Sequence, residues 1–246
     1  MQNQFSRTEL LLGSDAMETL RGARVAVFGV GGVGSYTAEC LARSGVGELT
    51  IVDNDTVSRS NRNRQLEALG STLGQRKTDA VAARLWDINP VLRLHPICET
   101  YDAANRERFF PEGCRYDYIA DAIDLVSCKL DLAETARRLH IPLIMTLGTG
   151  NKLDPSLLRL ADISETYGCP LARVMRKELR ARGIRHLKVV FSPEEAAKPA
   201  ALESPPPGRR SVPGSTPWVP ATAGLLLGCA IVRDLIAGAG KGDTQC

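Results

Sequence analysis

The chain has 246 residues, of which 43% are hydrophobic and 24% charged, and its net charge is +3. A chain of this length and composition can bury a core without disulfides or a structural metal, which excludes a disordered protein and a disulfide-framed miniprotein. The mild positive charge does not demonstrate a nucleic-acid partner. An aromatic content of 5% argues against a surface built from base-stacking rings.

The seven cysteines are scattered along the chain, and no two of them form a CxxC pair. An odd number of scattered thiols is typical of a reducing compartment rather than of a disulfide framework or a zinc site. The N-terminal residues show no basic stretch followed by an apolar core, so we expect a cytoplasmic protein without a secretory signal. The longest apolar run, residues 219–237, contains Arg233 and Asp234, and we expect a buried or interface helix there rather than a membrane span.

Helical apolar spacing and β-rich runs alternate up to about residue 150. The predicted helices cover residues 6–21, 33–44, 77–89, 105–110 and 124–140. The predicted strands cover residues 23–29, 48–53, 92–97, 116–122 and 143–147. This alternation is typical of an α/β fold, so we predict a Rossmann-like, mostly parallel sheet with helices on both faces.

The character of the sequence changes after residue 150. A long basic helix is predicted over residues 162–182, a strand over 187–191 and a final helix over 221–237. Residues 199–220 are rich in Pro, Gly, Ser and Arg, and we expect a mobile loop over about 195–218. We therefore predict a single domain over residues 1–246. Its nucleotide-binding part ends near residue 150, and a C-terminal extension over 151–246 serves substrate and dimer contacts.

A glycine-rich segment, Gly29-Val-Gly-Gly-Val-Gly34, follows the first predicted strand and opens the next helix. Small residues let the backbone approach a phosphate, and the helix N-terminus offers free N–H groups and the positive end of its dipole. Asp53, at the end of the second strand, is placed to accept hydrogen bonds from ribose hydroxyls. By itself the motif predicts a nucleotide, with NAD as the default and a ligand-free tight turn as the alternative.

The polar segments that follow argue against NAD, because a hydride-transfer site has no need of further cations beside a strand-end acid. Arg64 can pair bidentately with phosphate oxygens, and Lys77 adds a point charge. Asp124, at the carboxyl end of the fourth strand, can hold Mg²⁺ against phosphates. Each of these residues alone is more simply explained as an exposed side chain or a helix cap. Together, at the carboxyl edge of one sheet, they favour a triphosphate.

These motifs resemble the superfamily of ubiquitin-activating-enzyme-like adenylyltransferases, which includes the molybdopterin- and thiamine-biosynthesis activators. The matching segments lie between residue 7 and about 150 and include Asp53-x-Asp55, Ser60-Asn61-x-Asn-Arg64-Gln65, Gly-Gln-x-Lys77 and Asp121-Ala-Ile-Asp124. The resemblance implies adenylation of a carboxylate with Mg-ATP. It implies catalytic roles for Arg7, Arg64, Lys77 and Asp124, with Asp124 as the Mg²⁺ ligand. It implies nucleotide contacts from Gly29, Gly31, Gly32, Gly34, Asp53, Asp55, Asn61, Arg64, Gln65 and Lys77.

Two features refine this resemblance. Arg7 matches an arginine that reaches into the partner subunit's ATP site, which implies a homodimer. Past residue 140, segments such as Gly148-Thr-Gly-Asn-Lys-Leu-Asp-Pro155 resemble the bacterial tRNA threonylcarbamoyladenosine dehydratases. That subfamily implies ATP-dependent dehydration of threonylcarbamoyladenosine next to the tRNA anticodon, by adenylation of the threonyl carboxylate. The expected cofactors are therefore ATP and Mg²⁺, with neither zinc nor NAD.

A cluster of basic residues gives weak, independent support to the tRNA assignment, because a local basic face is enough for phosphate contacts. A solvated basic helix is the alternative explanation. The expected tRNA contacts are Arg173, Arg176, Lys177, Arg180, Arg209 and Arg210.

Three other functions remain open. The first is activation of a ubiquitin-like sulfur carrier, with a sulfur-transfer protein as partner; the missing CxxC pairs oppose it. The second is a nucleotide-sensing module without turnover, which has no reason to keep the full phosphate-binding set. The third is an NAD-dependent oxidoreductase. Cys128 and Cys169 are candidates for a thioester, although buried packing explains them more simply.

Overall fold

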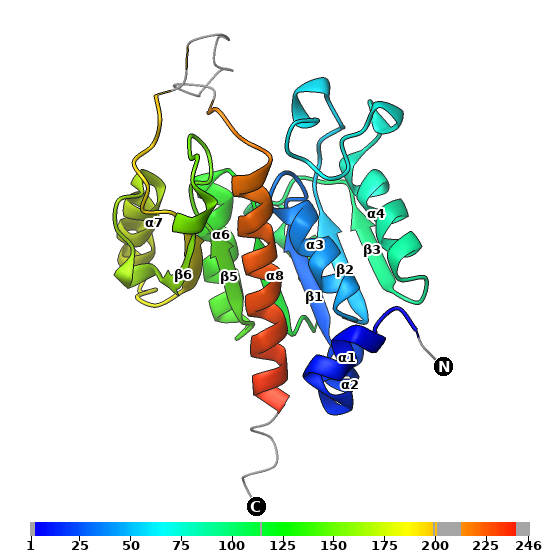
Figure 1. The fold of residues 1–246 in the computed structure, drawn as a ribbon. Helices are drawn as coiled ribbons and strands as arrows, with labels where there is room; N and C mark the ends of the chain where they lie inside the picture. The colour runs from blue at the N-terminus through cyan, green and yellow to red at the C-terminus, as the bar shows by residue number, and fades with distance from the viewer. Residues whose placement is uncertain (1–2, 114, 199, 201–212, 240–246) are drawn as a thin grey trace, which may run out of the picture.

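The computed structural model describes residues 3–113, 115–198, 200 and 213–239. These residues form one seven-stranded sheet in the order β3-β2-β1-β4-β5-β7-β6 (Figure 1). Neighbouring strands run parallel, except that β6 is antiparallel to β7. The predicted α/β fold with a mostly parallel sheet is thus confirmed. The strands are β1 (Arg24–Phe28), β2 (Glu48–Val52), β3 (Arg93–Ile97), β4 (Tyr118–Asp121), β5 (Leu143–Thr146), β6 (Arg159–Asp162) and β7 (Lys188–Phe191).

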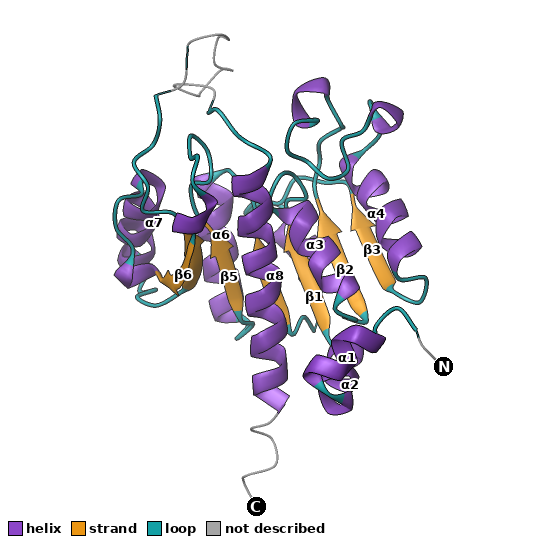
Figure 2. Cartoon of the chain, viewed as in Figure 1, coloured by secondary structure: helices purple, strands orange, loops and turns teal. Residues whose placement is uncertain are grey.

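Helices cover both faces of this sheet, as Figure 2 shows. One hydrophobic core lies between the sheet and α2, α3, α4 and α8, and a second lies between the sheet and α5, α6 and α7. The helices are α1 (Ser6–Leu12), α2 (Ser14–Gly22), α3 (Gly34–Arg43), α4 (Lys77–Ile88), α5 (Arg106–Phe109), α6 (Val126–Arg138), α7 (Pro170–Ala181) and α8 (Trp218–Ala239). Short 3₁₀ turns are η1 (Arg59–Asn61), η2 (Gly70–Thr72), η3 (Pro155–Leu157) and η4 (Ile163–Glu165).

The central strand β1 is apolar from Val25 to Phe28 because both of its faces are covered. Val25 and Val27 belong to the core beneath α3 and α8, whereas Ala26 and Phe28 belong to the core beneath α6. Successive side chains of a strand point to opposite faces, so a parallel strand covered on both sides needs an unbroken apolar run.

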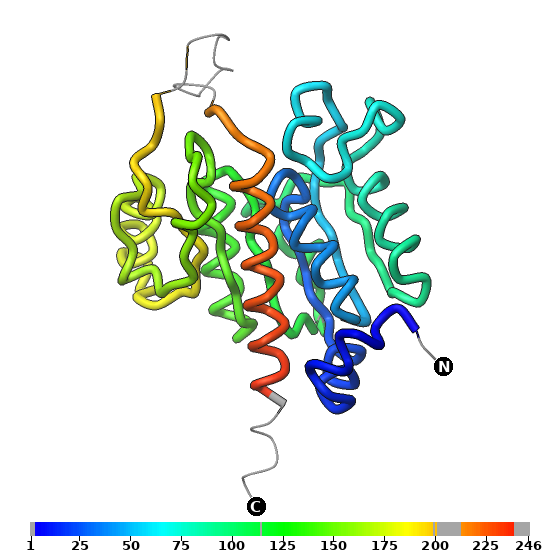
Figure 3. Tube along the Cα trace, viewed as in Figure 1, coloured from blue at the N-terminus to red at the C-terminus, as the bar shows by residue number. Residues whose placement is uncertain are grey.

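The C-terminal helix α8 packs along α3 and the sheet (Figure 3). The Thr37 hydroxyl donates to the Gly224 carbonyl at 3.1 Å, and a Cβ at Gly224 would lie 2.3 Å from the Val33 carbonyl oxygen. Among the described helices, Trp218–Gly238 alone is long and apolar enough to cross a membrane, but half of its most apolar window is buried inside the fold. These contacts agree with the expected buried helix.

The N-terminal helical prediction is partly wrong. The predicted helix over residues 6–21 is divided into α1 and α2 at Gly13, whose φ is +88° and whose N–H donates to the Glu9 carbonyl at 2.8 Å. Glycine adopts a positive φ without the steric cost that a Cβ imposes, so the chain turns there and starts a second helix.

The prediction of a basic helix over residues 162–182 is wrong in its start. Residues 159–162 form the edge strand β6, and α7 begins only at Pro170. The Asp162 carboxylate accepts hydrogen bonds from the Ser164 N–H at 2.9 Å and the Leu187 N–H at 3.1 Å. It therefore ends the strand and caps the following turn, while Pro170 supplies the fixed φ of a first helical residue.

The C-terminal boundary also differs, because α8 begins at Trp218 rather than at residue 221. Pro220 lies within the first turn, where its missing N–H costs no hydrogen bond. Most of the predicted mobile loop, residues 199 and 201–212, lies outside the described residues, and so do Arg209 and Arg210. The single-domain assignment, divided near residue 150, stays a prediction.

Candidate nucleotide-binding site

A cleft of about 600 Å³ lies at the carboxyl ends of the central strands. Its walls include the segments that leave β1, β2, β3, β4 and β5, together with residues 213–215 and Pro220 from the C-terminal part of the chain. This is the edge of the sheet at which the sequence predicts that the polar motifs meet. The cleft contains residues from every motif named above except Arg7 and the basic cluster.

The glycine loop allows close packing at the base of this cleft. Gly29 has a φ of +83°, and its N–H donates to the Val52 carbonyl at 2.7 Å. A Cβ at Gly29 would lie 2.7 Å from the Ala122 carbonyl oxygen, and one at Gly34 would lie 1.7 Å from the Gly29 carbonyl oxygen. Glycine is therefore required at both positions, and the loop can lead directly into α3, whose first turn supplies the free N–H groups that suit a phosphate.

Asp53 is held in place by the glycine loop itself. One of its carboxylate oxygens accepts from the Val30 N–H at 2.9 Å, and the other accepts from the Asp55 N–H at 2.9 Å. The carboxylate is thus oriented at the end of β2 before any ligand is present. An acceptor fixed in this way suits the hydroxyls of a ribose.

Lys77 is a buried cation, although it is the first residue of α4. Its side chain is 6% exposed, and its ammonium lies 2.7 Å from an Asp55 oxygen and 4.0 Å from an Asp53 oxygen. Burying a charge is costly unless the charge is paired, so these carboxylates keep the ammonium at the wall of the cleft. A phosphate group entering the cleft would meet a cation that is already in position.

The segment that carries Arg64 forms the wall above the glycine loop. An Arg64 guanidinium nitrogen donates to the Ser60 carbonyl and to the Asn63 side-chain oxygen, both at 2.9 Å. The Asn61 side chain accepts from the Ser58 N–H at 2.9 Å and so shapes the turn. Gln65 faces Gly31, and its side-chain oxygen is buried without a hydrogen-bond partner among the described residues. A buried polar atom of this kind at a cleft wall fits a polar ligand.

Asp124 lies on a turn that is supported by a buried ion pair. The Lys129 ammonium lies 3.0 Å from an Asp121 oxygen and donates to the Ile123 carbonyl at 2.8 Å, and both charged side chains are fully buried. The same Asp121 oxygen accepts from the Ile123 N–H at 3.0 Å. This arrangement fixes the residue before Asp124. No local pattern predicts this role of Lys129, because its position in a helix resembles that of any solvated lysine.

The chemistry of these donors fits nucleotide phosphates and a singly ligated Mg²⁺. Mg²⁺ usually keeps several waters and takes one or two carboxylates in addition to phosphate oxygens. Asp124 is an exposed carboxylate that lines the cleft. The described residues contain no group of three or more His, Cys, Asp or Glu side chains that could hold a metal without the nucleotide.

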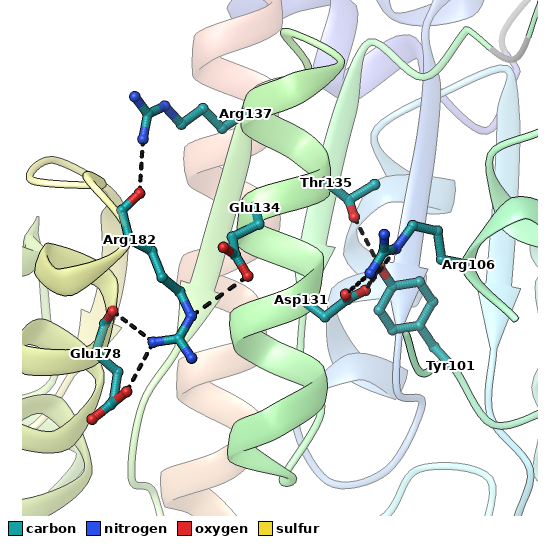
Figure 4. A network of polar contacts seen from close by, with 8 residues as sticks. All are labelled: Tyr101, Arg106, Asp131, Glu134, Thr135, Arg137, Glu178 and Arg182. Atoms are coloured by element: carbon teal, nitrogen blue, oxygen red, sulfur yellow. Dashed lines mark hydrogen bonds and ion pairs between the residues drawn. The ribbon is translucent and has the colours of Figure 1, made fainter. Parts of the chain in front are cut away.

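Tyr101 closes the end of the cleft beside β3. Its ring packs edge-on against Phe28 with centroids 5.0 Å apart, and its hydroxyl donates to an Asp131 oxygen at 2.6 Å. Figure 4 shows that Arg106 pairs with the same carboxylate of α6. Burial, together with the hydrogen bond to Asp131, raises the pKa of Tyr101 well above its usual range. Tyr101 lies in a loop, so no sequence pattern predicts that it closes the cleft.

Glu67 is a third feature that the sequence does not reveal. It is 2% exposed, and neither carboxylate oxygen has a hydrogen-bond partner among the described residues. Burial raises the pKa of this carboxyl to about 7, although the nearby Lys77 charge opposes the shift. Gln65, two positions earlier, and Lys77, whose charge acts on Glu67, both line the cleft.

The remaining predicted residues lie outside the cleft. Arg7 is exposed on α1, which lies at the amino ends of the strands, at the opposite end of the sheet from the cleft (Figure 1). On α7, the Arg176 guanidinium donates to the Thr166 carbonyl at 2.6 Å and to its hydroxyl at 2.7 Å, and so is engaged within the fold. The other predicted basic residues on this helix are exposed: Arg173, Lys177 and Arg180.

The two candidate cysteines are buried. Cys128 is 5% exposed at the cleft wall and Cys169 is 4% exposed, and both belong to the core beneath α6 and α7. Burial raises the pKa of the Cys128 thiol, which opposes formation of the reactive thiolate. Packing therefore accounts for Cys128 better than nucleophilic catalysis does.

Comparison with known proteins agrees with this geometry. The profile of the ThiF family matches residues 5–237. A tRNA threonylcarbamoyladenosine dehydratase of Bacillus subtilis is 42% identical over 96% of both chains. A molybdopterin-synthase adenylyltransferase of Escherichia coli is 33% identical, but over only 57% of this chain and 56% of its own length.

A solved structure extends the similarity to the whole fold. The crystal structure of the Escherichia coli tRNA threonylcarbamoyladenosine dehydratase in complex with ATP superposes with a TM-score of 0.87 at 32% identity. The superposition covers 97% of this chain and 96% of that one, so the C-terminal part is included as well as the nucleotide-binding part. A family profile that matches nearly the whole chain, together with this shared fold, shows that the chain belongs to the ThiF family.

Proposed function

We propose that this protein is an ATP-dependent tRNA threonylcarbamoyladenosine dehydratase, which adenylates the threonyl carboxylate of the modified nucleoside next to the anticodon. The observation that carries the proposal is the extent of the similarity. Identity of 42% to the Bacillus subtilis dehydratase extends over 96% of both chains, whereas similarity to the molybdopterin-synthase adenylyltransferase covers little more than half. Nearly the whole chain therefore follows the dehydratase, whereas only part of it is similar to the adenylyltransferase.

ATP is the nucleotide that the cleft residues support. The Escherichia coli relative was crystallised with ATP and with AMP. Here the glycine loop and Gly31, Gly32 and Asn61 line the same cleft as Asp53, whose carboxylate is oriented for a ribose. Arg64 and Lys77 supply two positive charges at the wall, which suits a polyphosphate.

The reaction needs orientation and charge neutralisation more than it needs a nucleophilic side chain. The threonyl carboxylate oxygen attacks the α-phosphorus of ATP, and the bond to pyrophosphate breaks. The ureido group then attacks the activated acyl carbon, the ring closes and AMP leaves, so that the net change in the nucleoside is the loss of one water. Arg64 and Lys77 stabilise the negative charge that develops at phosphorus.

Mg²⁺ is proposed as the accompanying ion, with Asp124 as its protein ligand. When bound, it would neutralise part of the phosphate charge. The buried Asp121–Lys129 pair supports this function by fixing the turn before Asp124.

The proposal extends to tRNA, to a second copy of the chain and to the cytoplasm. Arg173, Lys177 and Arg180 form an exposed basic face on α7 that suits RNA phosphates. Arg7 lies far from the cleft of its own chain, so a role at a nucleotide requires the cleft of a partner in a homodimer. The described cysteines are free, which suits a reducing compartment.

The decisive experiment measures pyrophosphate release from Mg-ATP by the purified protein. Three arms are compared: tRNA that carries threonylcarbamoyladenosine, tRNA that lacks it, and no tRNA. We expect release only with the modified tRNA, together with loss of the mass of one water from the nucleoside. Release that ignores tRNA but responds to a Gly-Gly-tailed carrier protein would instead support the sulfur-carrier function.

A further inference from the structure

Residues 213–215 reach the cleft from the C-terminal part of the chain and are held there by two asparagines. The Gly214 N–H donates to the Asn151 side-chain oxygen at 2.6 Å, and the Asn151 N–H donates back to the Gly214 carbonyl at 2.8 Å. From the opposite wall, the Asn63 amide donates to the Ser215 carbonyl at 2.9 Å. Pro213, Gly214 and Ser215 all line the cleft.

The backbone of Asn151 is specialised for this contact. Its φ is +58°, a left-handed conformation that asparagine tolerates better than most residues. Its carbonyl also accepts from the Ala197 N–H at 2.8 Å, so one residue binds both residue 197 and residue 214. A Cβ at the neighbouring Gly150 would lie 3.0 Å from Pro213, so the two segments are in close contact.

The second asparagine connects this segment to the phosphate-binding arginine. The Asn63 side-chain oxygen accepts from an Arg64 guanidinium nitrogen at 2.9 Å, while its amide nitrogen donates to Ser215. A continuous hydrogen-bonded path therefore crosses the cleft from Arg64, through Asn63 and residues 214–215, to Asn151. At Asn63 the path uses the side-chain oxygen as an acceptor and the side-chain nitrogen as a donor. An aspartate lacks the donor, and a leucine lacks both groups.

The order of the strands places residues 213–215, at the far end of this path, on one side of the cleft. Asp53 follows β2 and Tyr101 follows β3, so the nucleoside belongs on that side of the glycine loop. Residues 148–150 follow β5, on the other side of β1 and β4, and residues 213–215 lie against them. The acceptor that receives the adenylyl group must approach from the side that the nucleoside leaves open.

We propose that Asn151 and Asn63 are positioning residues that hold residues 213–215 as the wall of the acceptor side. They thereby determine how well the carboxylate substrate binds, and Asn63 also orients Arg64. The inference rests on the proposed function, because it assumes that a carboxylate is adenylated in this cleft. It predicts that the two asparagines act as one unit on the acceptor substrate.

Asn151→Gly tests the wall, because glycine keeps the left-handed backbone and the main-chain bonds but removes the side-chain acceptor. We expect the KM for threonylcarbamoylated tRNA to rise about tenfold, because the hydrogen bond to Gly214 is lost and the segment that it held is freed. The Kd for ATP should stay within about twofold, measured by calorimetry without tRNA. An equal rise in both constants would overturn the inference.

His140→Gly is the matched control. His140 also has a left-handed backbone, with a φ of +55°, and is exposed on a turn after α6, outside the cleft. Glycine at position 140 raises the conformational entropy of the unfolded chain as glycine at position 151 does, but it leaves the hydrogen bonds along the path from Arg64 to Asn151 intact. Its KM for tRNA should equal that of the wild type. Comparing the melting temperatures of the two variants shows whether any change in the Asn151→Gly variant is a general loss of stability.

A double-mutant cycle tests whether the asparagines act as one unit. Asn63→Ala alone should raise the KM for tRNA and also weaken ATP binding through Arg64. The double variant Asn63→Ala/Asn151→Gly should raise the KM for tRNA by less than the product of the two single fold-changes, because both residues hold the same segment. Independent effects would contradict the inference. If the wild-type protein released no pyrophosphate with modified tRNA, the proposed function itself would fail, whereas an active wild type with an unchanged Asn151→Gly variant would refute only the positioning role.

Discussion

At the scale of single residues, the cleft is defined by charges that are placed before the substrate arrives. Lys77 is held against Asp53 and Asp55, and Asp53 in turn is held by the Val30 N–H of the glycine loop. Such preorganisation matters because groups already in position need not reorganise when charge develops in the transition state. Individual side chains are therefore expected to affect catalysis far more than stability.

Asp124→Ala tests this at the proposed metal ligand. The side chain is exposed, so the substitution leaves the core intact. We expect pyrophosphate release with modified tRNA to fall at least about 100-fold, the effect typical of losing one electrostatic contact to a transition state. The melting temperature should be that of the wild type, and turnover close to wild type would refute the metal role.

Glu67→Gln tests the buried carboxyl through the pH dependence of stability. Because the pKa of Glu67 is raised to about 7 in the folded state, the folded protein keeps this proton while the unfolded chain loses it near its ordinary pKa. The free energy of unfolding therefore falls as the pH rises from the ordinary glutamate pKa of 4.5 to about 7. Relative to wild type, the glutamine variant should gain about 2–3 kcal/mol in the free energy of unfolding between pH 5 and pH 8.

Urea titrations of both proteins at the two pH values measure this difference directly. Taking the difference between the two proteins removes the contribution of every other titrating group. A difference that does not change with pH would show that Glu67 titrates at its ordinary value.

At the scale of secondary-structure elements, α8 packs the C-terminal part of the chain against the N-terminal part. It packs against α3, which follows the glycine loop, and against the sheet. Two glycines on α8 allow this approach: Cβ atoms at Gly224 and Gly228 would lie 2.3 Å and 2.7 Å from atoms of α3 and the residue preceding it. The apolar composition of α8 thus serves helix packing within the fold.

Gly224→Ala should destabilise the protein by about 1–3 kcal/mol, because the added methyl group overlaps the Val33 carbonyl oxygen and forces α8 away from α3. Gly238→Ala is the control on the same helix, since a Cβ there meets nothing within 4 Å. That substitution should leave stability unchanged or raise it by about 0.5–1 kcal/mol. Thermal unfolding of both variants decides, and equal effects would contradict the packing role.

At the scale of the whole molecule, the position of α1 requires a second chain if Arg7 is to act at a nucleotide. The helix is exposed, and Leu10 and Leu11 on it are 80% and 84% exposed. Exposed large apolar side chains beside a basic residue suit a protein interface. A symmetric dimer would place each α1 against its partner.

Mixing the Arg7→Ala and Lys77→Ala variants tests that arrangement. Each variant alone should be nearly inactive. In a mixed dimer, one of the two clefts combines an intact Lys77 with an intact Arg7 from the partner, so random mixing should restore about a quarter of wild-type activity. The absence of any rescue after subunit exchange would exclude a shared site.

Local sequence patterns were enough to predict the fold class, the family and the position of the nucleotide cleft. These depend on local patterns: apolar runs in strands, helical spacing, and glycines that only a tight strand-to-helix turn requires. The chain order of the polar motifs then places them at one edge of the sheet, because parallel strands all end there.

Features that depend on distant partners could be recognised only in the folded chain. The antiparallel edge strand β6 exists through its pairing with β7, and the ion pair of Lys129 depends on burial that no local pattern reveals. The contact from Asn63 to Ser215 joins residues that are 152 positions apart. Burial and long-range hydrogen bonds are properties of the packed chain, so Glu67 and Asn151 could not be distinguished from ordinary polar residues until the fold brought their neighbours together.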